Sequence, residues 1–431
     1  MCDTHVLIKN NVVYFAKNSD REPDEAQLVV RVPETVSRKP EKLNATYVSI
    51  DQSPVRHGVL LSKPFWTWGA EMGANDLGVV IGNEAVYTRL NERSRGLIGM
   101  DLVRIGLERG DTAEHAMRVI IDLIEKHGQG GECGFRDKHM RYDNSFIIAD
   151  PSCAWILETA GRFWAAKQVN TFAAISNCLT IGKDYDLKSP GLEDKARKGG
   201  FFSGKGNFSF KKAFDTRFVP FFAASRRRLQ SSRNCLQRTI IEPEVQVQQM
   251  MYNLRTHDDP DATPATGSNR DICMHAGGFI RRSQTCGSMV SRLSGNGNCH
   301  FFTGTSAPCL SIFKPAAFHE EFSFSVLNKD ERTMEGSLWQ RNEQIHRRVI
   351  FNEESRQELQ ESIIGTENHM LSIIGKNDFQ PSRNDLKAAD DLVSGWMDQW
   401  YEKLKNEAIH YPSMSLYGQF WKYTNEREAM F

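Results

Sequence analysis

The chain opens with two runs rich in β-branched and aromatic residues, at 4–9 (T-H-V-L-I-K) and 12–17 (V-V-Y-F-A-K). Asn10 and Asn11 separate these runs. Asparagine tolerates a positive φ, which a two-residue hairpin turn requires. The pattern therefore predicts a β-hairpin at the start of the chain.

Apolar residues recur at helical spacing within 97–127. Gly110 interrupts this spacing and D-T-A-E at 111–114 resembles a capping box, so two consecutive helices are expected. Further helices are expected at 214–231, 242–255, 352–374 and 383–408. Strands are expected at 26–32, 45–50, 57–62, 77–82, 144–149, 153–158, 163–168 and 172–176, and in a strand-rich block at 285–313.

Blocks of strands and blocks of helices follow one another along the chain. This order, with hairpin-type turns, predicts an α+β fold in which layered sheets are flanked by helices. Residues 183–212 contain many Lys, Gly and Phe residues without a steady period, so we expect a mobile surface insertion there.

The composition is that of an ordinary globular protein, with 40 % hydrophobic and 25 % charged residues among 431. Lys plus Arg equal Asp plus Glu at 54 each, which gives no electrostatic case for nucleic acid or an acidic membrane as partner. No apolar run is long enough to span a membrane, and no secretory signal is expected. None of the nine cysteines forms a C-x-x-C pair, so we expect free thiols and a cytoplasmic location.

The predicted hairpin places ionisable side chains next to Cys2. If Lys9 pairs with Val12, the residue numbers of every pair across the hairpin add up to 21, so Cys2 lies opposite Ser19. Asp20 then lies near the amine that removal of Met1 would expose, and Lys17 is a diagonal neighbour of the thiol.

Such an arrangement could supply a nucleophile and its base from one residue. The α-amine of an exposed Cys2 has a pKa near neutrality and can take the thiol proton, while Asp20 orients the amine. Two alternatives stay open at this point. Cys2 can be a small buried hydrophobe, and Asp20 a solvated turn residue.

Three other residues are candidates for the catalytic site. Asn83 and Asn177 each end an apolar strand, where a side-chain amide can donate to a developing oxyanion. Arg226 begins the cluster R-R-R within a predicted helix. The alternatives are strand-ending turn asparagines and a solvated helix face.

Trp68 and Glu71, in W-T-W-G-A-E, could line a substrate pocket, with core packing of Trp66 and Trp68 as the alternative. Cys273-x-His275 lacks a second pair of ligands at a zinc-finger spacing, so packing is favoured over a metal. We expect no metal and no cofactor.

Several longer motifs resemble the secernin family. They are M-C-D-T at the start, K-N-S-D-R at 17–21, W-G-A-E-M-G-A-N at 68–75, G-V-V-I-G-N-E-A-V at 78–86, G-M-D-L-V-R-I-G-L-E-R at 99–109, C-M-H-A-G at 273–277, R-R-S-Q-T-C-G-S-M-V-S at 281–291 and F-F-T-G-T-S-A-P-C-L-S-I-F-K-P at 301–315. The resemblance implies a core at 2–315 and a mostly helical region at 316–431 packed on it.

Secernins are similar to cysteine dipeptidases and, more distantly, to penicillin V acylases and conjugated bile acid hydrolases. The resemblance therefore implies a four-layer αββα sandwich of the N-terminal nucleophile hydrolase type. In it Cys2 matches the nucleophile and Asp20 the aspartate beside its amine. Asn83, Asn177 and Arg226 match the remaining catalytic positions. Lys17 stands where the acylases carry arginine, so substrate handling is expected to differ.

The expected function is hydrolysis of small peptide-like amides, as a cysteine dipeptidase or amidohydrolase, with a peptide or N-acyl amino acid as substrate. Lys17, Trp68 and Glu71 are the expected substrate-binding residues. The resemblance also implies an alternative, a catalytically inactive secernin that acts as a binding factor in exocytosis. The oligomeric state is left open, with a homo-oligomer among the alternatives.

Overall fold

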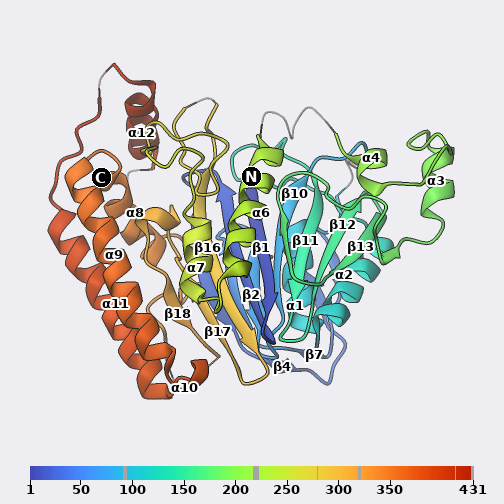
Figure 1. Ribbon diagram of the computed structural model, residues 1–431, viewed down its shortest axis with the longest axis horizontal. Coiled ribbons are helices and arrows are strands. Elements are labelled where there is room, and N and C mark those ends of the chain that lie inside the picture. Colours follow the sequence, from blue (N-terminus) through green and yellow to red (C-terminus); the bar gives the residue numbers. More distant parts are fainter. Residues whose placement is uncertain (91–94, 217–222, 279, 319–321, 413, 429–431) are drawn as a thin grey trace.

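The computed structural model describes residues 1–90, 95–216, 223–278, 280–318, 322–412 and 414–428. Two large antiparallel sheets lie face to face at its centre, with helices on both outer sides (Figure 1). The expected α+β class and αββα layer order are confirmed. Within the described residues, no helix combines the length and the apolar character that a membrane span needs.

The first sheet has six strands and contains the N-terminal hairpin. Its order is β14 (Phe172–Ile175), β1 (Cys2–Lys9), β2 (Val12–Arg21), β16 (Gln284–Ser294), β17 (Gly297–Phe302) and β18 (Lys314–Ala316). Strands from the two ends of the core therefore lie side by side, with blue β1 and β2 next to yellow β16 in Figure 1.

The second sheet has eight strands and faces the first. Its order is β15 (Leu187–Lys188), β13 (Phe163–Val169), β12 (Ala154–Ala160), β11 (Asp143–Ala149), β10 (Val80–Val86), β9 (Met72–Asn75), β8 (Val59–Pro64) and β3 (Gln27–Val32). Two small sheets pair β4 (Thr35–Val36) with β7 (Val55–Arg56) and β5 (Lys42–Asn44) with β6 (Ser49–Asp51).

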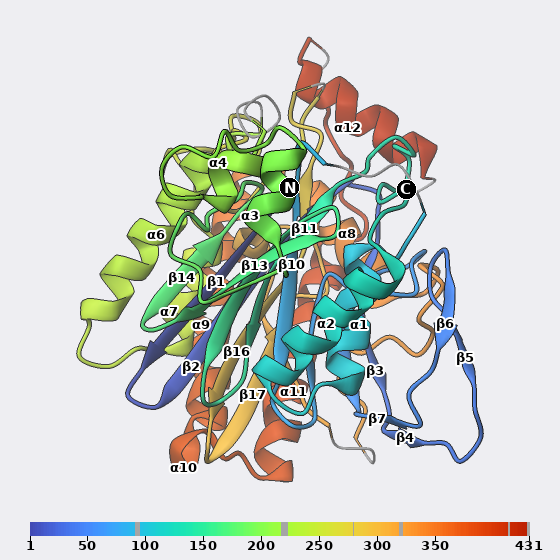
Figure 2. The same cartoon turned by 90° about the vertical axis from the view of Figure 1, so that its right-hand side faces the viewer.

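Helices cover the outer face of each sheet. Figure 2 shows α1 (Gly99–Arg109) and α2 (Ala113–His127) lying on the eight-stranded sheet. On the six-stranded sheet lie α6 (Ser225–Ile241) and α7 (Val247–Leu254). The remaining helical segments are α3 (Leu192–Lys198), α4 (Phe210–Phe214), η1 (Pro308–Leu310), α8 (Leu338–Val349), α9 (Glu353–Ile374), α10 (Lys376–Phe379), α11 (Arg383–Leu404) and α12 (Leu416–Arg427).

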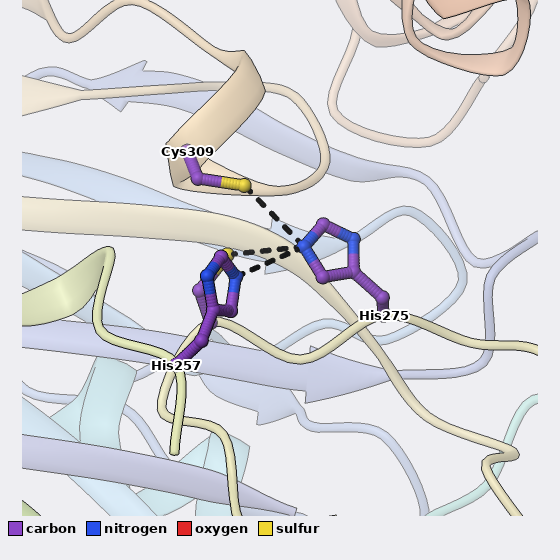
Figure 3. A group of neighbouring side chains, drawn as sticks. His257, His275 and Cys309 are labelled. Atoms are coloured by element: carbon purple, nitrogen blue, oxygen red, sulfur yellow. Dashed lines mark hydrogen bonds between the residues drawn. The ribbon is translucent and has the colours of Figure 1, made fainter. Parts of the chain in front are cut away.

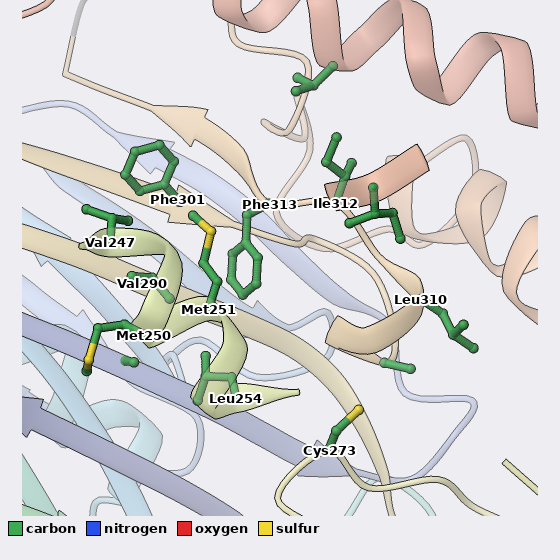
Figure 4. Packing of buried hydrophobic residues seen from close by; sticks show 14 of the residues in the cluster. Val247, Met250, Met251, Leu254, Cys273, Val290, Phe301, Leu310, Ile312 and Phe313 are labelled. Carbon is green, nitrogen blue, oxygen red and sulfur yellow. The ribbon is translucent and has the colours of Figure 1, made fainter. Parts of the chain in front are cut away.

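Alternation along the hairpin strands fills two cores at once. Val6 and Phe15 point between the sheets, whereas Leu7 and Ala16 point toward the outer helices. Figure 4 shows the outer core, where Met250 and Met251 of α7 pack with other apolar residues of this layer. Burial on both faces explains why these strands read as continuous apolar runs.

The predicted hairpin is confirmed in its turn and its register. Asn10 and Asn11 have φ values of 52° and 59°, as a two-residue turn requires. Lys9 pairs with Val12 and Cys2 with Ser19. The break at Gly110 is also confirmed, and Thr112 caps α2 by accepting a hydrogen bond from the His115 amide.

Other predicted boundaries are wrong. Residues 45–48 form the turn between β5 and β6 rather than a strand. The strand expected at 77–82 begins later, at Val80, because the Asn75 side chain accepts hydrogen bonds from the amides of Leu77 and Val79 and closes a turn. In the helix expected at 214–231, residues 217–222 lie outside the described residues, and α6 begins at Ser225.

The segment 183–212 contains short elements rather than an irregular excursion. It holds β15 and α3 and leads into α4. Phe208, Phe210 and Phe214 contact one another edge to face and are buried. An aromatic cluster therefore anchors this segment to the core between the sheets.

Candidate active site

Cys2 lies at the first position of β1, where the hairpin brings it next to the end of β2. Its thiol is buried, with 5 % of the residue exposed. The Asp20 amide donates to Cys2 Sγ at 3.3 Å, and Glu71 Oε2 lies 3.9 Å from the same sulfur. Burial raises the pKa of the thiol to about 12, and the charge of Lys17 opposes this rise.

The backbone of Cys2 is held on both sides by polar groups. Its N–H donates to Asn177 Oδ1 at 3.0 Å. Arg228 donates from Nη1 to the Cys2 carbonyl at 3.2 Å and from Nη2 to Asn177 Oδ1 at 2.7 Å. Asn177 in turn donates to the Ala85 carbonyl, which fixes its amide orientation. Asn177 therefore presents its oxygen to the nitrogen of Cys2.

Asp20 lies beside the chain terminus, as the hairpin register predicts. The Met1 ammonium donates to the Asp20 carbonyl at 2.8 Å, and Thr285 Oγ1 donates to Asp20 Oδ1 at 2.6 Å. Asp20 Oδ2 is buried and has no hydrogen-bond partner among the described residues. Burial raises the pKa of this carboxyl to about 6, against the opposing charges of the terminus and Arg228.

Arg228 is the arginine of its cluster that reaches the site. It is fully buried and pairs with Asp3 at 2.6 Å, with Asp20 Oδ2 3.9 Å away. Arg226 is placed differently from the expectation: its side chain is 56 % exposed and pairs with Asp215 at 3.2 Å. The helix turns by about 200° between the two positions, so one faces the sheet and the other faces solvent.

Lys17 lies on the same face as the thiol, in the space between the sheets. Its Nζ donates to the Asn83 carbonyl at 2.7 Å and pairs with Glu84 at 3.2 Å. Burial alone would lower the pKa of Lys17, but Cys2, Glu84 and Glu71 raise it above its usual range. The lysine is therefore a permanent positive charge near the thiol.

The side chain of Asn83 points away from Cys2, contrary to the expectation of an oxyanion donor. Its Nδ2 donates to Asn144 Oδ1 at 3.1 Å, beneath Gly99 at the start of α1. Strand alternation explains this placement, because Gly82 and Glu84 on either side face Lys17. What Asn83 brings to the site is its backbone carbonyl.

Glu71 is brought to the thiol, whereas Trp68 is not. Arg21 pairs with Glu71 at 3.1 Å and with Glu25 at 2.6 Å, so Glu71 keeps one oxygen directed toward Cys2. The Trp68 ring lies 4.2 Å from the Arg104 guanidinium of α1, in the outer helix layer.

Sequence reasoning missed two residues near the site. Arg21 directly follows Asp20 at the end of β2, and its charge was not connected to Glu71 because Glu71 lies 50 residues away, directly before β9 of the other sheet. Tyr142 lies beside Arg21, with its hydroxyl 3.4 Å from Nη1. No local signal in the sequence distinguishes this tyrosine from a core residue.

Comparisons with solved structures find weak likenesses. A mutant conjugated bile acid hydrolase from Clostridium perfringens is 10 % identical, with 74 % of this chain and 98 % of that chain covered, at a TM-score of 0.41. Penicillin V acylase from Agrobacterium tumefaciens is 13 % identical, with 76 % of this chain and 89 % of that chain covered, at a TM-score of 0.41. The N-acylethanolamine-hydrolyzing acid amidase ortholog of Caenorhabditis elegans is 9 % identical, with 67 % of this chain and 92 % of that chain covered, at a TM-score of 0.33.

No family model matches the chain. At these identities and TM-scores the fold assignment rests on the strand order and layers of the chain itself.

Proposed function

We propose that this chain is a cysteine amidohydrolase that cleaves a C–N bond in small peptide-like amides through a thioester on Cys2. One observation carries the proposal. Asn177 Oδ1 accepts the N–H of the buried Cys2, and Asp20, beside the chain terminus, keeps one buried oxygen that accepts no hydrogen bond and lies 3.9 Å from Arg228 Nη1. Buried polar atoms without partners are rare, and a free ammonium on Cys2 would supply donors for both.

The proposal requires cleavage of the Met1–Cys2 bond. While Met1 is attached, the nitrogen of Cys2 is an amide and cannot accept a proton. The ammonium of Met1 already lies against the Asp20 carbonyl, so the site accommodates a positive charge there. Removal of Met1 moves that charge to Cys2 and frees space beside its thiol.

The reaction then follows from the groups around Cys2. The neutral α-amine takes the proton of the thiol, and the sulfur attacks the carbonyl carbon of the substrate. The resulting ammonium gives its proton to the departing nitrogen as the C–N bond breaks, which leaves a thioester. The same amine then takes a proton from water, whose oxygen attacks the thioester and releases the acid and the thiol.

Charges around the thiol support the ionised sulfur during attack. Burial raises the pKa of the Cys2 thiol, and Lys17, held in place by Glu84, opposes that rise. Arg228 and Asn177 fix the backbone of Cys2, so the amine and the thiol keep one geometry. The amide of Asn83 is turned away, so we assign the oxyanion donor to the Tyr142 hydroxyl, which lies 3.4 Å from Arg21 Nη1.

Glu71 favours a dipeptide over an N-acyl substrate and so favours the secernin-type dipeptidase. A carboxylate oxygen 3.9 Å from the nucleophilic sulfur is suited to bind the free ammonium of a peptide, which lies next to its first carbonyl. An N-acyl group would offer this carboxylate no positive charge. Glu71→Gln is therefore expected to raise KM for dipeptides at least 10-fold, while KM for N-acyl amino acids changes little.

The direct test is hydrolysis by matched cysteine variants. Protein with a verified N-terminus is incubated with a panel of dipeptides and N-acyl amino acids, and released amine is measured. Cys2→Ala is expected to abolish release at an unchanged thermal midpoint, and Cys299→Ala, at a buried cysteine in β17, is expected to keep it. Equal activity of wild type and Cys2→Ala would refute the proposal.

A second candidate is a binding factor without catalysis, as the secernin resemblance also allows. The observation that favours it is the burial of Cys2, which keeps the thiol protonated near neutral pH while Met1 is attached. Retention of Met1 in the cellular protein, together with full cellular function of Cys2→Ala, would support this candidate over the enzyme.

A further inference from the structure

Four potential metal ligands lie close together next to the six-stranded sheet, between the end of α7 and η1. They are His257, after the end of α7, Cys273 and His275 in the loop before β16, and Cys309 in η1. Their ligand atoms all lie within 4.8 Å of one another. Figure 3 shows the imidazole of His275 directed toward His257 and Cys309.

The three distances from His275 Nε2 are close to those between the ligands of a tetrahedral zinc ion. The two Nε2 atoms of His257 and His275 are 3.2 Å apart. His275 Nε2 lies 3.8 Å from Cys273 Sγ and 3.3 Å from Cys309 Sγ. Zn–N bonds of about 2.05 Å and Zn–S bonds of about 2.3 Å at tetrahedral angles give edges of about 3.3 Å and about 3.6 Å.

Hydrogen bonding does not account for this cluster. His275 Nε2 carries either one proton or one lone pair, so it can make one of its three short contacts at a time. Three polar atoms nevertheless surround it, and both Cys273 and His275 are buried. A cation at the centre of the four atoms would satisfy all of them together.

We propose that His257, Cys273, His275 and Cys309 bind one structural Zn²⁺ ion. Two thiolates and two imidazoles in a tetrahedral set are typical of zinc, whereas calcium and magnesium prefer oxygen ligands. All four positions come from the protein, so the site has no open position for a substrate. His257 is half-buried, so an ion could reach the four ligands past its side chain.

The zinc site would hold together loops that support Asp20. The amides of Ile272 and Cys273 donate to the Thr256 carbonyl, so the two loops already contact each other. The Met274 amide, between two ligands, donates to Thr285 Oγ1 at 2.9 Å, and that hydroxyl donates to Asp20. Asn18 of β2 also donates to the carbonyl of Leu254, at the end of α7, and to that of Ile272, which precedes Cys273.

Metal content tests the proposal without reference to catalysis. Untagged full-length protein is purified without chelators, and its metals are quantified by inductively coupled plasma mass spectrometry. We expect one zinc per chain. His257→Asn, at the outermost ligand, and Cys309→Ser are expected to lose at least four fifths of it, whereas Cys299→Ser, a buried cysteine outside the cluster, keeps it.

Cobalt provides a second measurement in case a variant fails to fold. Wild-type protein reconstituted with Co²⁺ should show the visible bands of a tetrahedral site and a thiolate-to-metal charge-transfer band, and added Zn²⁺ should remove both. Three results for the wild-type protein would overturn the assignment. They are binding of neither metal, a disulfide between Cys273 and Cys309, and stoichiometric iron or copper in place of zinc. Full zinc content in both ligand variants would overturn it as well.

Discussion

The reactivity of Cys2 depends on the charges and donors within a few ångströms of it. Burial raises the pKa of the thiol, and Lys17 acts against that rise. Glu71 opposes thiolate formation, yet Arg21 neutralises part of its charge. In the proposed reaction the α-amine of Cys2 is the base, because no histidine among the described residues has a hydrogen bond to the thiol.

A matched pair of arginines tests the geometry around Cys2. Arg228→Lys keeps the charge but loses the fork that joins the Cys2 carbonyl to Asn177, so kcat is expected to fall about 100-fold. Arg226→Lys, two residues away on α6, alters an exposed pair with Asp215 and should change kcat less than twofold. Steady-state kinetics on one dipeptide measures both, and equal losses would contradict this assignment.

Asp20 couples stability to activity through its raised pKa. Burial raises the pKa of Asp20 from the usual 3.8 of an aspartate to about 6 in the folded protein, so the folded state binds the proton more tightly. The stabilisation from this group is complete below about pH 4 and is lost as the pH rises to about 6. At pH 7.5 the buried carboxylate therefore costs up to about 3 kcal/mol.

Asp20→Asn removes that charge and should raise the thermal midpoint at pH 7.5 but not at pH 4. The same change should lower kcat at least 100-fold, since the amine of Cys2 loses its carboxylate. Thermal unfolding at the two pH values and kinetics on a dipeptide check both effects. A lower midpoint at pH 7.5 would show that the carboxylate stabilises the fold.

Which side chains face the site could be predicted from the sequence in part. The hairpin sum of 21 predicts the neighbours of Cys2 correctly, because a two-residue turn fixes the register. Because three arginines follow one another at the start of α6, the sequence does not show which of them faces the sheet, and Arg226 could not be distinguished from Arg228. Asn83 was misplaced for the same kind of reason, since the sequence does not show which face of β10 meets the hairpin.

At the scale of elements, the β1–β2 hairpin is the unit that builds the site. Its turn sets the register, and β16 pairs with β2 along its length, so Cys2, Lys17 and Asp20 are held by one sheet. Asn10 and Asn11 both have positive φ, which β-branched residues avoid.

Asn11→Val should therefore destabilise the protein by about 1–2 kcal/mol, because the turn needs a left-handed backbone at this position. Asn11→Gly is the matched control and should change stability by less than about 0.5 kcal/mol, since glycine adopts this backbone freely. Denaturant unfolding followed by tryptophan fluorescence measures both. Equal stability of the two variants would mean that the turn does not set the register.

At the scale of the whole molecule, the C-terminal helices belong to the same folded unit as the sheets. The α9 carboxylate of Glu367 binds both Nη atoms of Arg255, at 2.6 Å and 2.8 Å, and accepts the Phe313 amide. Arg255 follows α7 and lies two residues before His257. The tail therefore supports the layer that carries the proposed zinc site.

Glu367→Ala should cost about 3–5 kcal/mol, because it leaves the Arg255 charge buried without its partner. Glu361→Ala, on an exposed position of the same helix, should change stability by less than about 0.5 kcal/mol. Thermal unfolding compares the two variants. Similar midpoints would indicate that α9 packs on the core without this ion pair.

Contacts between residues far apart in the sequence could not be predicted from the sequence. The layer order follows from blocks of strands and helices, so the fold class was predictable. Three of the four clustered ligands lie in the connection between α7 and β16 and the fourth in η1, and they are separated in sequence by 15, 1 and 33 residues, a spacing that matches no zinc motif. Contacts of this kind form only when strands from both ends of the core pair.

The mass of the N-terminal peptide in the active protein shows whether Cys2 carries the free amine that the proposed reaction needs. Protein that hydrolyses a dipeptide is digested and its first peptide is sequenced by tandem mass spectrometry. We expect this peptide to begin at Cys2 and to carry an unmodified amine. Active protein that retains Met1, or whose Cys2 amine is blocked, would contradict it.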